Sequence, residues 1–253
     1  MPHHEENQNF SSPPESHSFS ALLFDMDGTI IDSTDAIIKH WHQIGKEIGV
    51  DGDEILKTSH GRRSIDVLAI LCPERANWEY VCKAEGVIPK LYGNDAVEIP
   101  GARKFLEKLE GLGVVSWAIV TSGTKPLVMG WLERMKLAVP KFMVTAEEVQ
   151  HGKPNPEPYL EGARRLGKSG KEDVLVFEDA PSGVRAGKAA GFKVLALATT
   201  HEVEELREAG ADWIVRDLRS VRVERFDGKS GIVTVEIRDA LVVRAEGGAG
   251  SME

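Results

Sequence analysis

An apolar tetrapeptide that runs directly into two aspartates constrains the fold of this chain more than any other stretch of its sequence. Residues 21–24 (ALLF) are all apolar, which predicts a short strand buried on both faces of a parallel sheet. Asp25, Asp27 and Gly28 follow directly. In open α/β sheets the ligand crevice lies beyond the carboxyl ends of the strands, so we expect these residues at a binding site.

The two carboxylates require a positive partner. An ordinary turn would account for Asp27 and Gly28, because both residue types are common in turns. A turn does not account for Asp25, since a charge against an apolar strand is costly unless an opposite charge lies beside it. Two neighbouring carboxylates also repel each other, and a divalent cation with oxygen ligands relieves both. The sequence therefore predicts a site for a metal and an electrophile.

The rest of the chain predicts an α/β fold interrupted by a helical insertion. Between residues 34 and 99 apolar side chains recur at helical spacing without a convincing strand, whereas strands and helices alternate on either side. We expect a Rossmann-like parallel-sheet core at 19–33 and 100–245, an all-helical cap at 34–99, a disordered tail at 1–18 and a flexible tail at 246–253. Alternating apolar residues around Asp227 and Gly228 predict a terminal hairpin.

Composition argues against several classes of partner. The 253 residues include 40 acidic and 31 basic side chains, a net charge of -9, without a dense basic run, so we expect no nucleic-acid partner. No segment approaches the roughly 20 apolar residues of a membrane span, and the polar N-terminus lacks the apolar core of a signal peptide. Cys72 and Cys82 form no CxxC motif and have no clustered histidines nearby, which favours free thiols over a zinc site. We expect a cytoplasmic monomer or weak dimer that binds a small molecule.

Polar residues follow several of the predicted strands, and a parallel sheet would bring them to one edge. Besides the two aspartates, these residues are Thr121, Ser122, Gly123, Glu178 and Asp179, with Lys153 at the start of a helix. Together they offer carboxylates for a hard cation, hydroxyl and backbone N–H groups for phosphoryl oxygens, and one ammonium group. These are the parts that phosphoryl transfer requires.

Each of these polar residues also has an ordinary explanation. Thr121 could cap the next helix, Lys153 could be a solvated surface lysine, and Asp179 could cap the helix that begins at Pro181. Their joint occurrence in chain order favours one shared site over several coincidences.

The order of these motifs resembles the haloacid dehalogenase superfamily of phosphohydrolases. The motifs are FDMDGT at 24–29, VTSG at 120–123, KP at 153–154 and VFEDAPSG at 176–183. Segment 34–99 resembles the cap of that family, which implies a haloacid dehalogenase-like fold. SHGRR at 59–63, GKPNPEPYL at 152–160 and SVRV at 220–223 resemble the fungal glycerol-phosphate and 2-deoxyglucose-6-phosphate phosphatases.

The resemblance implies a Mg²⁺-dependent phosphomonoesterase that acts on glycerol phosphate, on 2-deoxyglucose 6-phosphate or on a related ester. It gives Asp25 the role of nucleophile that becomes an aspartyl phosphate, and Asp27 that of general acid and base with a raised pKa. The implied metal ligands are Asp25, the backbone carbonyl of Asp27, and Asp179, with Glu178 alongside. The implied phosphoryl ligands are Thr121, Ser122, Gly123 and Lys153.

The resemblance also assigns Gly61 and Arg63, in a loop of the cap, to contact with the rest of the substrate. For Arg62, solvent and substrate contact stay equally open. Two other functions remain as alternatives, a sugar phosphomutase on the same scaffold and a non-catalytic, phosphate-binding signalling module. Receiver modules of the second kind are much shorter than this chain and have no inserted cap.

Overall fold

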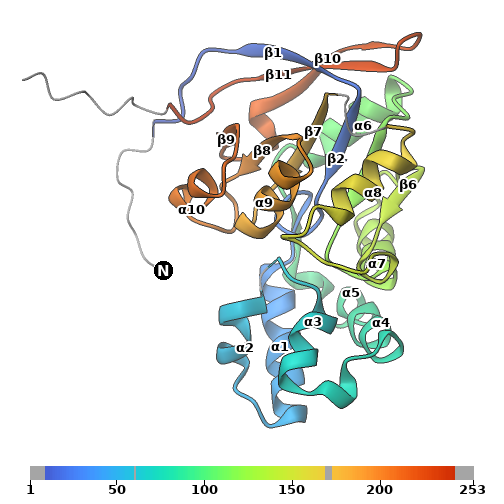
Figure 1. Cartoon of the computed structure of the whole chain (residues 1–253), viewed down its shortest axis with the longest axis vertical. Coiled ribbons are helices and arrows are strands. Elements are labelled where there is room, and N and C mark those ends of the chain that lie inside the picture. Colours follow the sequence, from blue (N-terminus) through green and yellow to red (C-terminus); the bar gives the residue numbers. More distant parts are fainter. Residues whose placement is uncertain (1–8, 60, 169–172, 243–253) are drawn as a thin grey trace, which may run out of the picture.

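A six-stranded parallel sheet forms the centre of the molecule (Figure 1), in a computed structural model that describes residues 9–59, 61–168 and 173–242. All four residues of the strand predicted at 21–24 are buried, and this strand, β2, lies between β5 and β7. The predicted α/β fold is therefore confirmed. The order across the sheet is β6 (Phe142–Val144), β5 (Trp117–Val120), β2 (Ala21–Phe24), β7 (Val174–Glu178), β8 (Lys193–Leu197) and β9 (Trp213–Val215).

The side chains of β2 alternate between two apolar layers. Leu22 and Phe24 belong to the cluster on the side of α6 (Ala102–Gly111) and α7 (Lys125–Met135). Ala21 and Leu23 belong to the cluster on the opposite side, with helices that follow later strands. Those helices are α8 (Glu157–Arg165), α9 (Pro181–Ala189) and α10 (Val203–Glu208).

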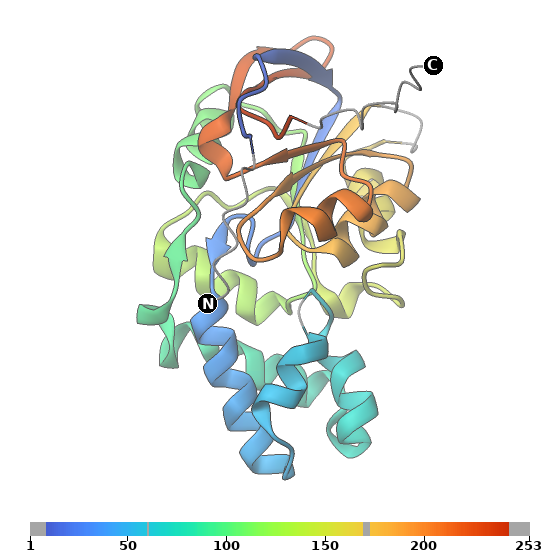
Figure 2. The ribbon, with the colours of Figure 1, turned by 90° about the vertical axis from the view of Figure 1, so that its left-hand side faces the viewer.

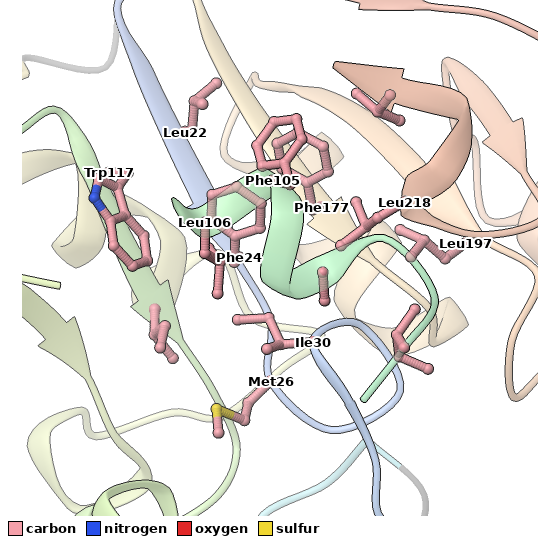
Figure 3. Packing of buried hydrophobic residues seen from close by; sticks show 14 of the residues in the cluster. Leu22, Phe24, Met26, Ile30, Phe105, Leu106, Trp117, Phe177, Leu197 and Leu218 are labelled. Atoms are coloured by element: carbon pink, nitrogen blue, oxygen red, sulfur yellow. The ribbon is translucent and has the colours of Figure 1, made fainter. Parts of the chain in front are cut away.

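Aromatic packing fixes the carboxyl ends of the two central strands. Phe24 at the end of β2 stacks on Phe177 of β7, with ring centroids 4.3 Å apart and planes 7° apart. Phe105 and Trp117 meet Phe24 edge-on, and Figure 3 shows this group with Met26 just beyond the strand. Stacked and edge-on aromatic pairs each add about 1 kcal/mol beyond the burial of their area. The residues that follow Phe24 and Phe177 are thus held by a rigid core.

A second, antiparallel sheet corrects the expectation for the N-terminus. The predicted terminal hairpin is present as β10 (Val221–Asp227) and β11 (Ile232–Ile237), and β1 (Glu15–Phe19) pairs with the other side of β11. Residues 15–18 are therefore a strand and not part of a disordered tail. Their polar side chains gave no strand signal, because the pairing partner lies more than 200 residues along the chain. Residues 1–8 and the predicted tail at 246–253 lie outside the described residues.

Five α-helices form a layer at one end of the molecule, beyond the carboxyl ends of the central strands (Figures 1 and 2). They are α1 (Thr34–Ile48), α2 (Gly52–Ser59), α3 (Ser64–Leu71), α4 (Trp78–Gly86) and α5 (Ile88–Leu91), with the short helices η1 (Pro73–Arg75) and η2 (Gly93–Asp95). This helical segment packs around its own apolar cluster, which includes Trp41, Ile55 and Val81. The segment therefore has an apolar core of its own.

The helical segment is not entirely helical. At its base β3 (Ile31–Asp32) pairs antiparallel with β4 (Val97–Glu98), so the two connections between the helical segment and the core run side by side. The expectation of no strand between 34 and 99 is therefore wrong at Val97 and Glu98. A strand of two residues is too short to show an alternating pattern in the sequence. The remaining short helices, both in the core, are η3 (Ala146–Glu148) and η4 (Leu218–Ser220). Within the described part of the chain, no helix has both the length and the apolar character needed to cross a membrane.

Candidate active site

The polar residues that follow the central strands line one cavity, between the sheet and the helical segment. Its volume is about 110 Å³. The core contributes Asp25, Asp27, Gly28, Thr121, Ser122, Gly123, Lys153, Glu178 and Asp179 to its wall. The helical segment contributes Ile37, His40, Trp41, Gly61, Arg62, Ser64, Glu85 and Ile88. The structure thus brings together residues that the sequence separates by more than 150 positions.

The turn after β2 directs both aspartates toward this cavity. Met26 between them is fully buried in the apolar cluster (Figure 3), so Asp25 and Asp27 lie on the other side of the chain. The turn then closes through a hydrogen bond from the Gly28 N–H to the Ile31 carbonyl, at 2.7 Å. Gly28 has φ +88°, and a Cβ there would lie 2.1 Å from Asp179 Oδ2. Only glycine permits this approach of the backbone to a carboxylate.

Lys153 supplies the ammonium group that the carboxylates require. Its Nζ donates to Asp25 Oδ1 at 2.5 Å, to Glu178 Oε1 at 2.7 Å and to the Val120 carbonyl at 3.1 Å. The ammonium group also lies 4.8 Å from the ring centroid of Tyr159. Lys153 is buried, so the alternative of a solvated surface lysine is wrong.

The two acids after β7 have different surroundings. Glu178 accepts hydrogen bonds from Lys153, from the Tyr159 hydroxyl at 2.8 Å, and from the backbone N–H groups of Asp179 and Ala180. Among the residues that the structure describes, the donors to Asp179 are two hydroxyls, those of Thr29 and Thr200. It is not the cap of α9 either, because the N-cap residue of that helix is Ala180. Asp179 is therefore better placed than Glu178 to bind a cation directly.

The acidic cluster fits a hard divalent cation. Asp25, Glu178 and Asp179 each offer an oxygen, and the three oxygens lie within 4.8 Å of one another. Burial raises the pKa of Asp25 to about 8, opposed by Lys153 and assisted by Glu178. Burial likewise raises the pKa of Asp179, with Glu178 and Asp25 adding to the effect. Three carboxylates facing one ammonium group leave an excess of negative charge, which a dication with oxygen ligands would offset.

Asp27 is held by a hydroxyl and has a raised pKa. It lies two residues beyond Asp25, and its Oδ1 accepts a hydrogen bond of 2.5 Å from Ser33 Oγ. Burial raises the pKa of Asp27, while the Ser33 hydroxyl and the charge of Lys153 lower it. The net direction is the one expected from the sequence for a general acid.

The segment after β5 joins the core to the loop between α2 and α3. Thr121 Oγ1 accepts from the Gly123 N–H at 3.0 Å and does not cap α7, whose N-cap residue is Thr124. Ser122 Oγ donates to the Gly61 carbonyl at 3.0 Å. Gly61 has φ +69°, and a Cβ there would lie 2.5 Å from the Oγ of Ser182. Glycine therefore lets this loop close down on the core.

The two arginines after Gly61 have different surroundings. Arg62 lines the cavity, whereas Arg63 is buried outside it. The guanidinium group of Arg63 pairs with Asp66, with both N···O distances at 2.8 Å. The expected contact between Arg63 and the substrate is therefore not supported by its placement. Two adjacent arginines look alike in a sequence. The direction of the backbone after Gly61 decides which of the two side chains reaches the cavity.

Sequence reasoning missed several polar residues of this region. Glu85 of α4 is buried against the cavity, where it accepts from Ser64 Oγ at 2.5 Å and from the Thr124 N–H at 2.7 Å. Tyr159 and Thr200 support Glu178 and Asp179. A carboxylate on an otherwise ordinary helix carries no signal of burial. Tyr159, in contrast, lies within the GKPNPEPYL stretch already singled out by resemblance.

The burial of His40 in α1 makes the stability of the protein depend on pH. Burial lowers the pKa of His40 from 6.5 to about 4. Between these values the unfolded chain binds a proton that the folded chain does not, so the free energy of unfolding falls as the pH drops. Between pH 7 and pH 5 we expect His40→Gln to lose about 2 kcal/mol less stability than the parent. Urea unfolding at the two pH values measures this difference, and parallel losses in both proteins would contradict it.

The family follows from comparison of the sequence with known proteins. The family model described as haloacid dehalogenase-like hydrolase matches residues 22–197. The chain belongs to this family. The match begins within β2 and ends with β8, so it includes the cavity-lining residues that follow β2, β5 and β7. The resemblance inferred from the sequence motifs is therefore confirmed.

Relatives within the haloacid dehalogenase-like family include phosphatases of Saccharomyces cerevisiae.

 Glycerol-1-phosphate phosphohydrolase 2 of that yeast is 41% identical over 241 residues, which cover 92% of this chain and 96% of the relative. The yeast 2-deoxyglucose-6-phosphate phosphatase 1 is 37% identical over 234 residues, or 85% of this chain and 95% of the relative. Among solved structures, a hydrolase from Pseudomonas syringae has the same fold, with a TM-score of 0.66 at 24% identity over 78% of this chain and 94% of that one.

Proposed function

We propose that this protein is a Mg²⁺-dependent phosphomonoesterase that hydrolyses a small polyol or sugar phosphate through an aspartyl-phosphate intermediate. The observation that carries the proposal is the set of contacts around Asp25. This carboxylate lies at the end of the central strand, paired with the buried Lys153 and clustered with Asp179 and Glu178. Acids and one fixed ammonium group around a cavity are the parts needed to bind and transfer a phosphoryl group.

Asp25 is the proposed nucleophile. One of its oxygens is held by Lys153, which leaves the other free to form a bond to phosphorus as the ester oxygen departs. Asp25, Asp179 and the backbone carbonyl of Asp27, with Glu178 alongside, would hold Mg²⁺. When bound, the cation supplies positive charge that draws the phosphoryl oxygens into the site. Thr121, the backbone N–H groups at Ser122 and Gly123, and Lys153 are the proposed partners of the remaining phosphoryl oxygens.

Asp27 is the proposed general acid and base. In the first step it donates its proton to the leaving alkoxide, and in the second it removes a proton from the water that attacks the aspartyl phosphate. Ser33 Oγ, which donates to Asp27 Oδ1, would hold the carboxyl group in place at the cavity wall. The raised pKa of Asp27 supports this role, because a donor must hold its proton near neutral pH.

The helical segment is the proposed cap that selects the organic part of the substrate. Gly61 brings the cap loop onto Ser122, and Arg62 places a guanidinium group in the cavity wall. A small cavity with polar groups on its cap side suits a short polyol. Glycerol phosphate is therefore the first proposed substrate and 2-deoxyglucose 6-phosphate the second, which agrees with the names of the two yeast relatives.

A phosphate-release screen tests the proposal. The purified chain is incubated with glycerol phosphates, 2-deoxyglucose 6-phosphate and other sugar and polyol phosphates, with Mg²⁺ or with EDTA. We expect catalytic release of inorganic phosphate with Mg²⁺ only, and fastest release from a glycerol phosphate. Isomerised sugar phosphate without release would favour a phosphomutase. Labelling that stops at one phosphate per chain would favour a signalling module.

A further inference from the structure

All donors of the Arg63 guanidinium group are occupied by the protein itself. The group has five N–H bonds. Two of them point at the carboxylate of Asp66, at 2.8 Å each. The other three meet the backbone carbonyls of Val149 at 2.9 Å, Gln150 at 3.0 Å and Ala146 at 3.3 Å. The side chain is only 7% exposed, so no donor of Arg63 is left for a substrate.

These carbonyls belong to the segment of the core that leads to Lys153. Residues 146–152 begin with η3 and end just before the lysine. Arg63 donates to three backbone carbonyls of this segment. Gly152 lies against the arginine so closely that a Cβ there would be 2.7 Å from Arg63 Nε. The next residue is Lys153, whose ammonium group pairs with Asp25 and Glu178. An arginine of the helical segment is therefore separated from the central ammonium group by a single residue of the core.

The arginine that holds residues 146–152 belongs to the helical segment, whereas residues 146–152 belong to the core. Arg63 is the N-cap residue of α3, two residues beyond Gly61, whose carbonyl accepts from Ser122 of the core. Glu157, within the core, fixes the same segment through the N–H groups of Gln150 and His151. The segment is thus held through its N–H groups by the core and through its carbonyls by the helical segment. Loss of the carbonyl contacts would leave it attached on one side only.

We propose that Arg63 is a positioning residue, which sets the placement of Lys153 when the helical segment is docked on the core and does not bind substrate. The proposal rests on the proposed phosphatase function for its kinetic consequences. Because Lys153 acts on the phosphoryl group, which all substrates share, the effect of Arg63 is the same for every leaving group. A residue that bound the organic part of the substrate would instead affect some esters and spare others.

The test compares Arg63→Ala with the parent on glycerol phosphate and on p-nitrophenyl phosphate. We expect kcat to fall between about tenfold and about 100-fold, by the same factor on both esters, as for a displaced catalytic group. KM should change little on either ester. Hydrogen exchange supplies a readout besides activity, and we expect the amides of 146–152 to exchange about tenfold faster. Arg63→Lys retains the buried charge opposite Asp66 but not the planar fork, so its losses should be smaller in both measurements.

Arg75→Ala is the matched control. Arg75 also belongs to the helical segment, pairs with Glu47 at 2.8 Å and lies over the ring of Tyr80, as Arg63 lies over that of Trp78. Its hydrogen bonds within the described part of the chain go to Glu47 and Tyr80, and not to residues 146–152. A general loosening of the helices would therefore appear in both variants, whereas faster exchange at 146–152 should appear in Arg63→Ala alone. Unchanged kcat, unchanged exchange at 146–152, or a KM that rises on one ester alone would each overturn the proposal. Failure of the parent to release phosphate would instead overturn the proposed function, and the exchange experiment would still test Arg63.

Discussion

Replacing Asp25 with asparagine is expected to lower kcat by roughly 10⁴-fold or more. The amide has nearly the same shape as the carboxylate and still offers an oxygen to Lys153 Nζ, which lies 2.5 Å from Asp25 Oδ1. It lacks the negative charge and the second oxygen that attack phosphorus. The loss should therefore appear in the chemical step while the fold is retained. Phosphate release under saturating substrate and Mg²⁺ measures it.

Asp32→Asn is the matched control for this substitution. Asp32 lies seven residues further on, where its Oδ1 accepts from the Thr34 N–H at 3.1 Å outside the acidic cluster. The same chemical change there should leave kcat within about twofold of the parent, since it touches no group near phosphorus. Urea unfolding of both variants shows whether a lost activity reflects a lost fold. Hydrolysis by Asp25→Asn at the parental rate would refute the assignment of the nucleophile and the roles built on it.

The strand ends could be located from the sequence because two independent signals agree there. A fully apolar run such as 21–24 marks a central strand, and an acid directly after it has no explanation within the strand itself. In the structure Lys153 pairs with Asp25 and Glu178, and oxygens of Asp25, Glu178 and Asp179 lie within 4.8 Å of one another, as the parallel topology predicts. The edge of the sheet at which the acids meet could thus be predicted from the sequence.

Features that depend on distant pairing could not be located in the same way. β1 is polar along most of its length and exists because β11 is there to pair with it. The family resemblance assigned Arg63 to the substrate, yet its guanidinium group donates to three backbone carbonyls that come more than 80 residues later. Local propensity contains no information about such partners.

Replacing Lys153 with glutamine is expected to have the second largest effect, because it removes the cation that the described acids of the cavity share. Asp25 and Glu178 would lose the ammonium group that offsets their charges inside the protein, so each must stay unpaired or take up a proton. Breaking a buried pair in this way costs about 3–5 kcal/mol of folding free energy. Urea unfolding in EDTA measures the loss. Lys57→Gln, which breaks the exposed pair with Glu54, should leave the unfolding midpoint unchanged.

The stability lost in Lys153→Gln should increase as the pH rises and decrease when Mg²⁺ is added. Asp25 already has a raised pKa of about 8 with Lys153 present, and loss of the ammonium group raises that pKa further. The folded variant then binds a proton that the unfolded chain releases, so its stability falls as the pH rises above the unfolded pKa of about 4. Mg²⁺ supplies positive charge to the same acids and should restore part of the stability. It should not restore kcat, because no ammonium group then holds Asp25 and the phosphoryl oxygens in place. A variant equally stable at pH 6 and pH 9 in EDTA would show that Lys153 does not balance this cluster.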